Sequence, residues 1–194
     1  SAMKKILVAC EYSQIVMSAF LEAGADAYSC DIIPSSGKHP ERHFQMDAIE
    51  CVKCQSWDLI IAHPPCTYLS NVTAPLIKKN GVINKERYKQ MLDSKKFFLS
   101  FFEIYKGKLC VENPIPLTIA KLPNYTQIVN PANFGSKYHK LICLWLRDLP
   151  PLLGTIDKNP YSISFHYTHN GGHARSRFFP EVAKAMAEQW LPIL

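Results

Sequence analysis

Reactive and ligand-binding side chains follow short apolar segments in this sequence. Cys66 comes after the apolar segment 57–62 and two prolines, and Glu112 directly follows the segment 108–111. A cysteine thiolate is a strong nucleophile, and a glutamate beside it can protonate or hydrogen-bond a ring nitrogen while the thiolate attacks the adjacent carbon. A buried structural cysteine and a capping glutamate are the alternatives for either residue alone.

Two aspartates are candidates for binding a nucleoside. Asp31 ends a strand-like segment from Ala27 to Cys30, and Asp47 ends a short segment farther on. A carboxylate at a second strand end can hold the hydroxyls of a ribose, and one at a third strand end can accept from an adenine amino group. The sequence lacks the glycine patterns that cradle phosphates, so an adenosine cofactor without a phosphate chain is favoured. S-adenosylmethionine is the commonest such cofactor, whereas simple capping of turns is the alternative for each acid.

The elements that must position these residues alternate between strand and helix. Strands are predicted over 5–10, 27–30, 57–62, 108–111 and 141–146. Helices are predicted from a Ser13 cap to Gly24, from an Asn84 cap to about Lys106, and over 180–190. This alternation indicates an α/β fold with a parallel or mostly parallel sheet and helices on both faces, in which ligands bind beyond the carboxyl ends of the strands.

The chain of 194 residues, 47% hydrophobic and 20% charged, is long enough for one domain. Ser1-Ala2 is interpreted as a cloning remnant before a native start at Met3, so the single domain is expected over 3–194. No apolar run or signal pattern indicates a membrane span or export. Seven cysteines, an odd number, favour a reducing, cytoplasmic setting over a disulfide framework.

The formal charge of +6 is concentrated in one stretch. Residues 78–96 hold seven basic and two acidic side chains, a net of +5. Such a stretch suits a polyanion, because neutralised phosphates release counterions, although a solvated helix face is the alternative.

Two further patterns resemble metal sites, but no metal is expected. Cys51-x-x-Cys54 has no second pair at a suitable distance, and the histidines at 166, 169 and 173 lie in a polar loop without a nearby carboxylate.

Several motifs resemble those of the cytosine-C5 DNA methyltransferase family. The segment 61–66 (Ile-Ala-His-Pro-Pro-Cys) resembles its Pro-Cys nucleophile motif, and 111–114 (Val-Glu-Asn-Pro) its Glu-Asn-Val motif. The segment 133–140 resembles its Tyr-Gly-x-Pro-Gln-x-Arg-x-Arg segment. The chain is most similar to short phage and prophage members, which share Ala-Cys-Glu, Ser-Cys-Asp, His-Pro-Pro-Cys-Thr, Cys-Leu-Trp-Leu and the terminal Arg-Ser-Arg-x-Phe-Pro to Gln-Trp pattern. The resemblance covers nearly the whole chain.

The resemblance implies a Rossmann-like class I S-adenosylmethionine-dependent methyltransferase fold and a covalent mechanism. Cys66 would add to C6 of cytosine while Glu112 engages N3, so that C5 accepts the methyl group; Lys140 matches the first arginine of the later motif. The cofactor contacts that it implies are Cys10, Glu11, Tyr12, Ser13, Asp31, Ile32, Asp47, Ala48 and Pro64. The substrate contacts expected are Pro65, Asn113, Lys78 and Lys79, with DNA as the partner of the basic stretch.

The sequence also departs from the family pattern. The turn 9–14 has no glycine, Ile142 replaces the second arginine, and Tyr138 stands where glutamine is expected. Only 48 residues follow Leu146, too few for a target-recognition domain. Two other functions therefore stay open: modification of a free pyrimidine nucleotide, and a degenerate methyltransferase that binds nucleic acid or a protein partner.

Overall fold

The computed structural model describes residues 2–157, 161–165 and 177–194, and its centre is a seven-stranded sheet of order β3-β2-β1-β4-β7-β10-β8. The strands are β1 Lys5–Ala9, β2 Asp26–Asp31, β3 His43–Gln45, β4 Leu59–Ala62, β7 Leu109–Pro114, β8 Gln127–Val129 and β10 Ile142–Arg147. The strands from β3 to β7 run parallel, and β10 is antiparallel to both β7 and β8. The expected α/β fold, a mostly parallel sheet with helices on both faces, is confirmed.

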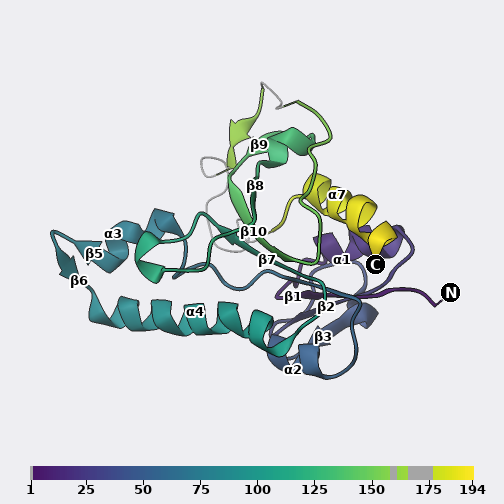
Figure 1. Cartoon of the computed structure of the whole chain (residues 1–194), viewed down its shortest axis with the longest axis horizontal. Coiled ribbons are helices and arrows are strands. Elements are labelled where there is room, and N and C mark those ends of the chain that lie inside the picture. Colours follow the sequence, from purple (N-terminus) through teal and green to yellow (C-terminus); the bar gives the residue numbers. More distant parts are fainter. Residues whose placement is uncertain (1, 158–160, 166–176) are drawn as a thin grey trace.

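Helices cover both faces of the sheet (Figure 1). One face packs on α1 (Ile15–Glu22) and α7 (Pro180–Trp190), and the other packs on α2 (Ala48–Lys53) and α4 (Lys85–Ile104). In β1, Ile6 and Val8 belong to the first core and Leu7 to the second, which is the alternation that a strand requires. Strands buried on both faces explain why the sequence shows continuous apolar runs instead of alternation.

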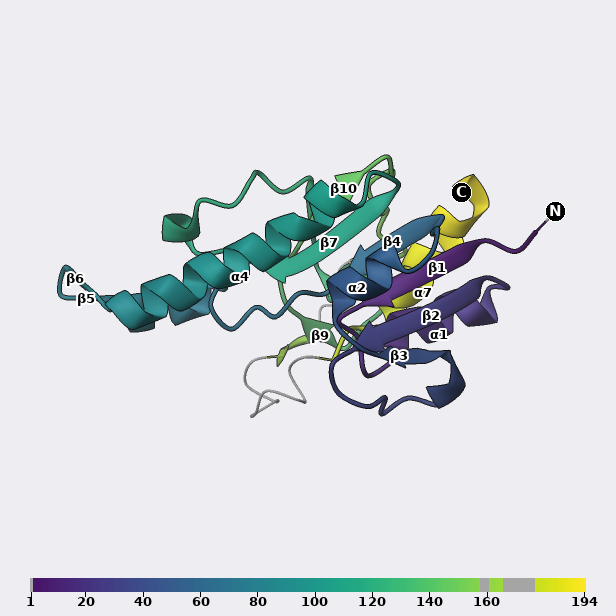
Figure 2. The ribbon, with the colours of Figure 1, turned by 90° about the horizontal axis from the view of Figure 1, so that it is seen from below.

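Smaller elements extend this frame. The short helix α3 (Ala74–Ile77) leads into a hairpin of β5 (Lys78–Lys79) and β6 (Val82–Ile83), and β9 (Tyr138–His139) pairs with β11 (Ile163–Ser164). Figure 2 shows the hairpin at the amino end of α4, projecting past the end of the sheet at which β1, β4 and β7 finish. No helix of the described residues is long and apolar enough to cross a membrane.

The predicted helix ends are partly confirmed. Asn84 accepts from the Arg87 N–H at 3.1 Å and so caps α4, and Gly24 follows α1 with a φ of +98°. The predicted Ser13 cap is wrong: residue 14 is the N-cap of α1, and the first turn of the helix is bonded by the Glu11 carboxylate instead. Glu11 takes the place of Ser13 because its longer side chain extends under the first turn of the helix and reaches these N–H groups.

Candidate active site

Four polar residues, three of them predicted as site residues, form one row at the carboxyl edge of the sheet. The registered pairs Ala9–Cys30, Ala9–Ala62 and Ala62–Val111 place the next residues of four neighbouring strands side by side. These residues are Asp31, Cys10, His63 and Glu112, which we call the edge row. At the usual strand spacing of about 4.8 Å the edge row spans about 15 Å. Asp31, Cys10 and Glu112 were predicted as site residues, whereas His63 was not.

The end of the row at β2 gathers the acids predicted to bind a nucleoside. Burial is the main cause that raises the pKa of Cys10 well above its usual value, and the charges of Asp31 and Asp47 contribute, so both acids lie near this thiol. The Asp31 carboxylate accepts from the backbone N–H of Ile33 at 3.2 Å, and the Ile32 side chain beside it is 72% exposed. An exposed aliphatic side chain next to a carboxylate can cover an apolar ring whose sugar the carboxylate holds.

Asp47 has a structural task as well. Its Oδ1 accepts from the backbone N–H groups of Ile49 at 2.9 Å and Glu50 at 3.1 Å, which makes it the N-cap of α2. The adjacent Ala48 is buried as the first residue of that helix. The predicted contacts of both residues with a cofactor remain predictions, and the capping alternative for Asp47 is realised.

The turn after β1 adopts a tight conformation without glycine. Cys10 and Gln14 have φ values of +60° and +61°, the left-handed region that costs a side-chain-bearing residue about 1–2 kcal/mol. Gln14 is held there because its amide donates to Ser29 Oγ at 3.0 Å and its Oε1 accepts from the His39 N–H at 3.0 Å. Side-chain hydrogen bonds therefore hold Gln14 in a backbone conformation that glycine adopts most easily.

Glu11 is buried under α1 and not at the open edge. Its Oε1 accepts from the Val16 N–H at 2.6 Å and its Oε2 from the Met17 N–H at 3.1 Å, with 4% of the residue exposed. Burial raises the pKa of this carboxyl above its usual value, although the charge of His63 and the backbone bonds oppose the rise. A cofactor contact of Glu11 can therefore involve only its backbone.

His63 contacts Glu112, the next residue of the row. It lies directly after β4, and its Nδ1 lies 3.1 Å from Oε1 of Glu112, with 11% and 16% of the two side chains exposed. Because an ionised carboxylate only accepts, Nδ1 carries the proton. Burial lowers the pKa of His63, but the bond to Glu112 and the charges of Glu112 and Glu11 outweigh it, so the net pKa is raised.

The loop that carries Cys66 is tied to the strand end that carries Glu112. The Cys66 carbonyl accepts from the Leu69 and Ser70 N–H groups at 3.0 and 3.1 Å. The Asn71 N–H then donates to Ile115 O, and the Leu117 N–H to Leu69 O, both at 2.8 Å. The loop that carries the half-exposed Cys66 is thus held beside the chain that continues from β7.

Predicted substrate contacts lie around this loop with different exposure. Pro64 is buried and Pro65 is exposed. Asn113 is fully buried, its amide donates to Pro114 O at 2.7 Å, and its Oδ1 has no partner among the described residues. A buried acceptor of this kind buttresses the strand end and leaves room for a water or ligand donor.

Lys140 lies just before β10, whose first residue Ile142 pairs with Pro114 at the end of β7. Its Nζ sits 5.4 Å from the centre of the Phe165 ring, a cation–π distance. The structure therefore brings Lys140 to the correct edge of the sheet, although the interaction that it makes there is with an aromatic ring and its predicted reactive role stays a prediction.

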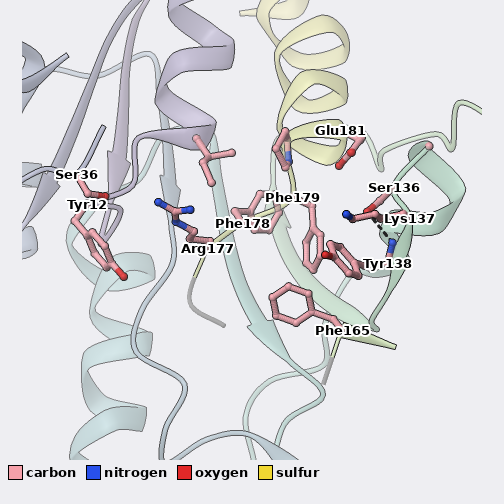
Figure 3. Close-up of a pocket in the computed structure, with 13 residues that line it drawn as sticks. Tyr12, Ser36, Ser136, Lys137, Tyr138, Phe165, Arg177, Phe178, Phe179 and Glu181 are labelled. Atoms are coloured by element: carbon pink, nitrogen blue, oxygen red, sulfur yellow. Dashed lines mark hydrogen bonds between the residues drawn. The ribbon is translucent and has the colours of Figure 1, made fainter. Parts of the chain in front are cut away.

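A cavity of about 940 Å³ opens between the turn after β1 and the start of α7 (Figure 3). Tyr12 and Arg177 stand on one side of it, the rings of Tyr138 and Phe165 lie on the other, and Phe178 lies beside Arg177. Phe178 also contacts the His63 ring, at a centroid distance of 4.8 Å, so the cavity adjoins the edge row. Ser13 instead lines a second cavity of about 740 Å³ along α1 and α7.

The remaining sequence patterns lie away from the edge row or beyond the described residues. Cys51 is hydrogen-bonded to Cys30, and the described residues contain no group of three or more histidine, cysteine or acidic side chains placed to hold a metal. The histidines at 166, 169 and 173 lie outside the described residues.

The predicted DNA-binding lysines form an exposed arm. Lys78 and Lys79 are both exposed on the hairpin, whose turn residues Asn80 and Gly81 have φ values of +50° and +79°. Arg87, in the first turn of α4, donates to Thr67 O at 2.9 Å and lies 4.8 Å from the Tyr68 ring centre. The start of α4, which follows this hairpin arm, is therefore joined to the loop that carries Cys66.

Sequence reasoning gave no role to His63, and it counted Arg87 only as part of the basic stretch. The signal for His63 was available, because it directly follows the apolar run of β4 as Glu112 follows the apolar run 109–111. The signal for the hairpin was the Asn-Gly pair, which is typical of two-residue hairpin turns.

No protein-family model matches the chain, and no curated protein matches it. Among solved structures, the chain is similar to a candidate DNA modification methyltransferase encoded within a prophage (E. coli), with a TM-score of 0.42 and 14% sequence identity. The alignment covers 75% of this chain and 46% of that chain. A likeness of this size assigns no function, so function has to be inferred from the edge row.

Proposed function

We propose that this protein is an S-adenosylmethionine-dependent methyltransferase that acts on C5 of cytosine in DNA through a covalent Cys66 adduct. The observation that carries the proposal is the edge row, with acids suited to a nucleoside at β2 and Glu112 at β7. Two backbone bonds of 2.8 Å fasten the Cys66 loop to the chain that follows β7, the strand of Glu112. One open edge thus offers a nucleophile, a partner for a ring nitrogen and a nucleoside site.

The residues divide the reaction between them. The Cys66 thiolate forms a bond to C6 of the pyrimidine, and the electron pair of the C5–C6 double bond moves to C5. Glu112 engages N3 and stabilises the charge that develops on the ring. Loss of the C5 proton returns its electron pair to the ring, restores the double bond and expels the thiolate. Lys140, beyond the same edge, is suited to interact with the electron-rich ring.

The residues of the β2 end fit the cofactor that the fold implies. Asp31 is suited to the ribose hydroxyls, the exposed Ile32 to one face of the adenine, and Asp47 keeps one carboxylate oxygen that the helix cap does not use. Tyr12 and Arg177 border the adjoining cavity, where a guanidinium could pair with the carboxylate of the methionine part. When bound, S-adenosylmethionine supplies the methyl group.

The exposed arm supports DNA over a free nucleotide as substrate. Lys78 and Lys79 project past the sheet edge, which suits the phosphate backbone on either side of a base that has left its stack. A free nucleotide would not need cations at this distance from the row. Recognition of a particular DNA sequence would then depend on few contacts, because phosphate contacts position a duplex without distinguishing its bases.

A covalent trap tests the proposal. Duplex DNA containing 5-fluorocytosine should form a stable adduct with the protein in the presence of S-adenosylmethionine, because fluorine cannot leave C5 as the proton does. Intact-mass spectrometry would detect the adduct. Cys66→Ser should abolish it, whereas Cys54→Ser, which changes another exposed cysteine, should leave it unchanged.

The alternatives give other outcomes. An adduct with a fluorinated nucleotide but none with DNA would favour the nucleotide enzyme. No adduct with either, together with DNA binding, would favour a degenerate methyltransferase. An adduct that persists in Cys66→Ser would contradict the assigned nucleophile.

DNA binding by the arm has its own test. Lys78→Ala/Lys79→Ala should reduce the steepness of the salt dependence of DNA binding by about 2 in log–log slope, since each phosphate contact contributes about 0.9. The control Lys53→Ala/Lys184→Ala removes two exposed lysines that pair with acids of their own helices. Equal slopes for the two double variants would contradict the role of the arm.

A further inference from the structure

His63 lies beside Glu112 in the edge row, and the proposed function gives it no role. Its backbone N–H donates to Ala9 O at 3.0 Å, which continues the pairing of β4 with β1 beyond the strand. Its side chain is held between the Glu112 carboxylate and the Phe178 ring. Both the backbone and the ring of His63 are therefore fixed before any substrate arrives.

The groups that face this imidazole come from three elements. Glu112 on β7 bonds Nδ1, Glu11 from the turn after β1 contributes a second negative charge, and Phe178 before α7 supplies an aromatic ring. Two carboxylates against one buried imidazole favour its protonated form. Nε2 is buried and has no hydrogen-bond partner among the described residues, so the ring is anchored to protein by Nδ1 alone within that set.

The surroundings of Glu112 show why it needs such a partner. On β10, Leu144 is the residue in register with Glu112, and Ile142 is paired with Pro114 and buried. Both are aliphatic. Burial raises the pKa values of the Cys143 thiol on β10 and the Cys110 thiol on β7, and the Glu112 charge adds to this rise. Within the described residues, His63 is the side chain that bonds Glu112. His63 approaches the carboxylate from β4, which lies on the side of β7 opposite to β10.

We propose that His63 is the positioning residue of Glu112. The Nδ1–H bond holds Oε1 of Glu112, which leaves Oε2 to face the ring nitrogen of the pyrimidine. The role rests on the proposed function and deepens it. It forms no covalent bond with substrate and needs no additional reactant.

Two substitutions of His63 separate the effect of its hydrogen bond from the effect of its charge. Asparagine places its amide nitrogen close to where Nδ1 stands, so His63→Asn keeps the donor and loses the charge, whereas His63→Ala loses both. The rate of adduct formation with 5-fluorocytosine DNA should fall at least 10-fold in His63→Ala and recover most of that loss in His63→Asn. Affinity for S-adenosylmethionine should change less than 2-fold in both.

The pH dependence gives a readout that a structural role would not move. The ratio of the wild-type rate to the His63→Asn rate should be largest near pH 6 and decrease as the imidazolium loses its proton at higher pH. His39→Asn is the matched control, because the Nδ1 of His39 also faces a glutamate, Glu41, at 3.5 Å but lies outside the edge row. Its ratio to wild type should not vary with pH.

A titration of the imidazole by NMR tests the contact without any substrate. The His63 Cε1–H signal, assigned by its loss in His63→Asn, should titrate at a lower pH in Glu112→Gln than in the wild type. An unchanged titration in Glu112→Gln would overturn the proposal, and this test does not depend on the activity of any His63 variant. Normal adduct formation by His63→Ala would overturn it while leaving the proposed function intact, and a wild-type protein that forms no adduct would overturn both.

Discussion

The two ends of the edge row differ in how their charged groups are satisfied. At the β2 end, the carboxylates of Asp31 and Asp47 bond backbone N–H groups within a few residues of themselves. At the β7 end, the Glu112 carboxylate bonds a side chain 49 residues away in sequence, and buried atoms of His63 and Asn113 are left without partners among the described residues.

This difference separates binding from chemistry. Acids held by their own local backbone are rigid, so they can recognise a ligand without a large conformational cost. At the β7 end, side chains that bond one another keep buried polar atoms without partners among the described residues, so a change in one residue alters the position of the other. We therefore expect substitutions at the β2 end to change affinity and substitutions at the β7 end to change rate.

The largest effect is expected at the β7 end. Glu112→Gln removes the group that engages N3, and loss of a positioned acid–base group costs about 10²–10³-fold in rate. Adduct formation measured by rapid quench should fall by that factor, while the calorimetric affinity for S-adenosylmethionine stays within 2-fold. An equal loss of affinity would mean that the two ends of the row do not divide the work.

Asp31→Ala should produce the opposite pattern. A hydrogen bond to a charged group contributes about 1.5–3 kcal/mol, so the dissociation constant for S-adenosylmethionine should rise about 10–150-fold. At saturating cofactor the rate of adduct formation should return to the wild-type value. Unchanged affinity in the calorimeter would remove Asp31 from the cofactor site.

Glu11→Ala tests the buried carboxylate beneath α1. It leaves the N–H groups of Val16 and Met17 without their acceptor, which should lower the free energy of unfolding in urea by about 1–3 kcal/mol. Glu11→Gln keeps one acceptor oxygen and should lower it less. Equal losses in both variants would show that charge and not acceptance of the helix N–H groups is what matters.

The raised pKa of His63 makes part of the stability depend on pH. A group whose pKa is higher in the folded than in the unfolded protein binds its proton more tightly when folded, so its stabilisation is complete below the unfolded value of about 6.5. This stabilisation is lost as pH rises through the folded pKa. The difference in unfolding free energy between wild type and His63→Asn should therefore decrease from pH 6 to pH 9, and an increase would contradict the ion pair.

The smallest effect is expected at the strained turn. Cys10→Gly relieves the left-handed conformation but gives up a partly buried side chain, so the unfolding free energy should change by no more than about 1 kcal/mol. Affinity for the cofactor should not decrease, because the turn keeps its shape. A large loss of affinity would assign the thiol itself to the site.

Sequence reasoning was most successful where structure is determined locally. The apolar runs of β1, β4 and β7, the Asn84 cap and the start of α7 at Pro180 all depend on neighbouring residues, and each was predicted to within a few positions. The edge row followed in part from the rule that ligands bind at the carboxyl ends of parallel strands.

The missed features depend on partners distant in sequence. The three-residue strand β8 exists because it pairs with β10, and α2 is a six-residue helix stabilised by its Asp47 cap and its packing on β1, β2 and α4. The contact of His63 with Glu112 needed the register of β4 on β7, which no local pattern contains. The hairpin was the exception, since Asn80-Gly81 was a local signal for it.

The most direct test of the proposed function is the identity of the methylated base. Duplex DNA incubated with the wild-type protein and isotopically labelled S-adenosylmethionine would be digested to nucleosides and analysed by liquid chromatography and mass spectrometry. The edge row and the Cys66 loop predict label in 5-methylcytosine, and none in DNA treated with Cys66→Ser. Label on an exocyclic nitrogen of cytosine or adenine, or no label in DNA at all, would contradict the proposed C5 chemistry.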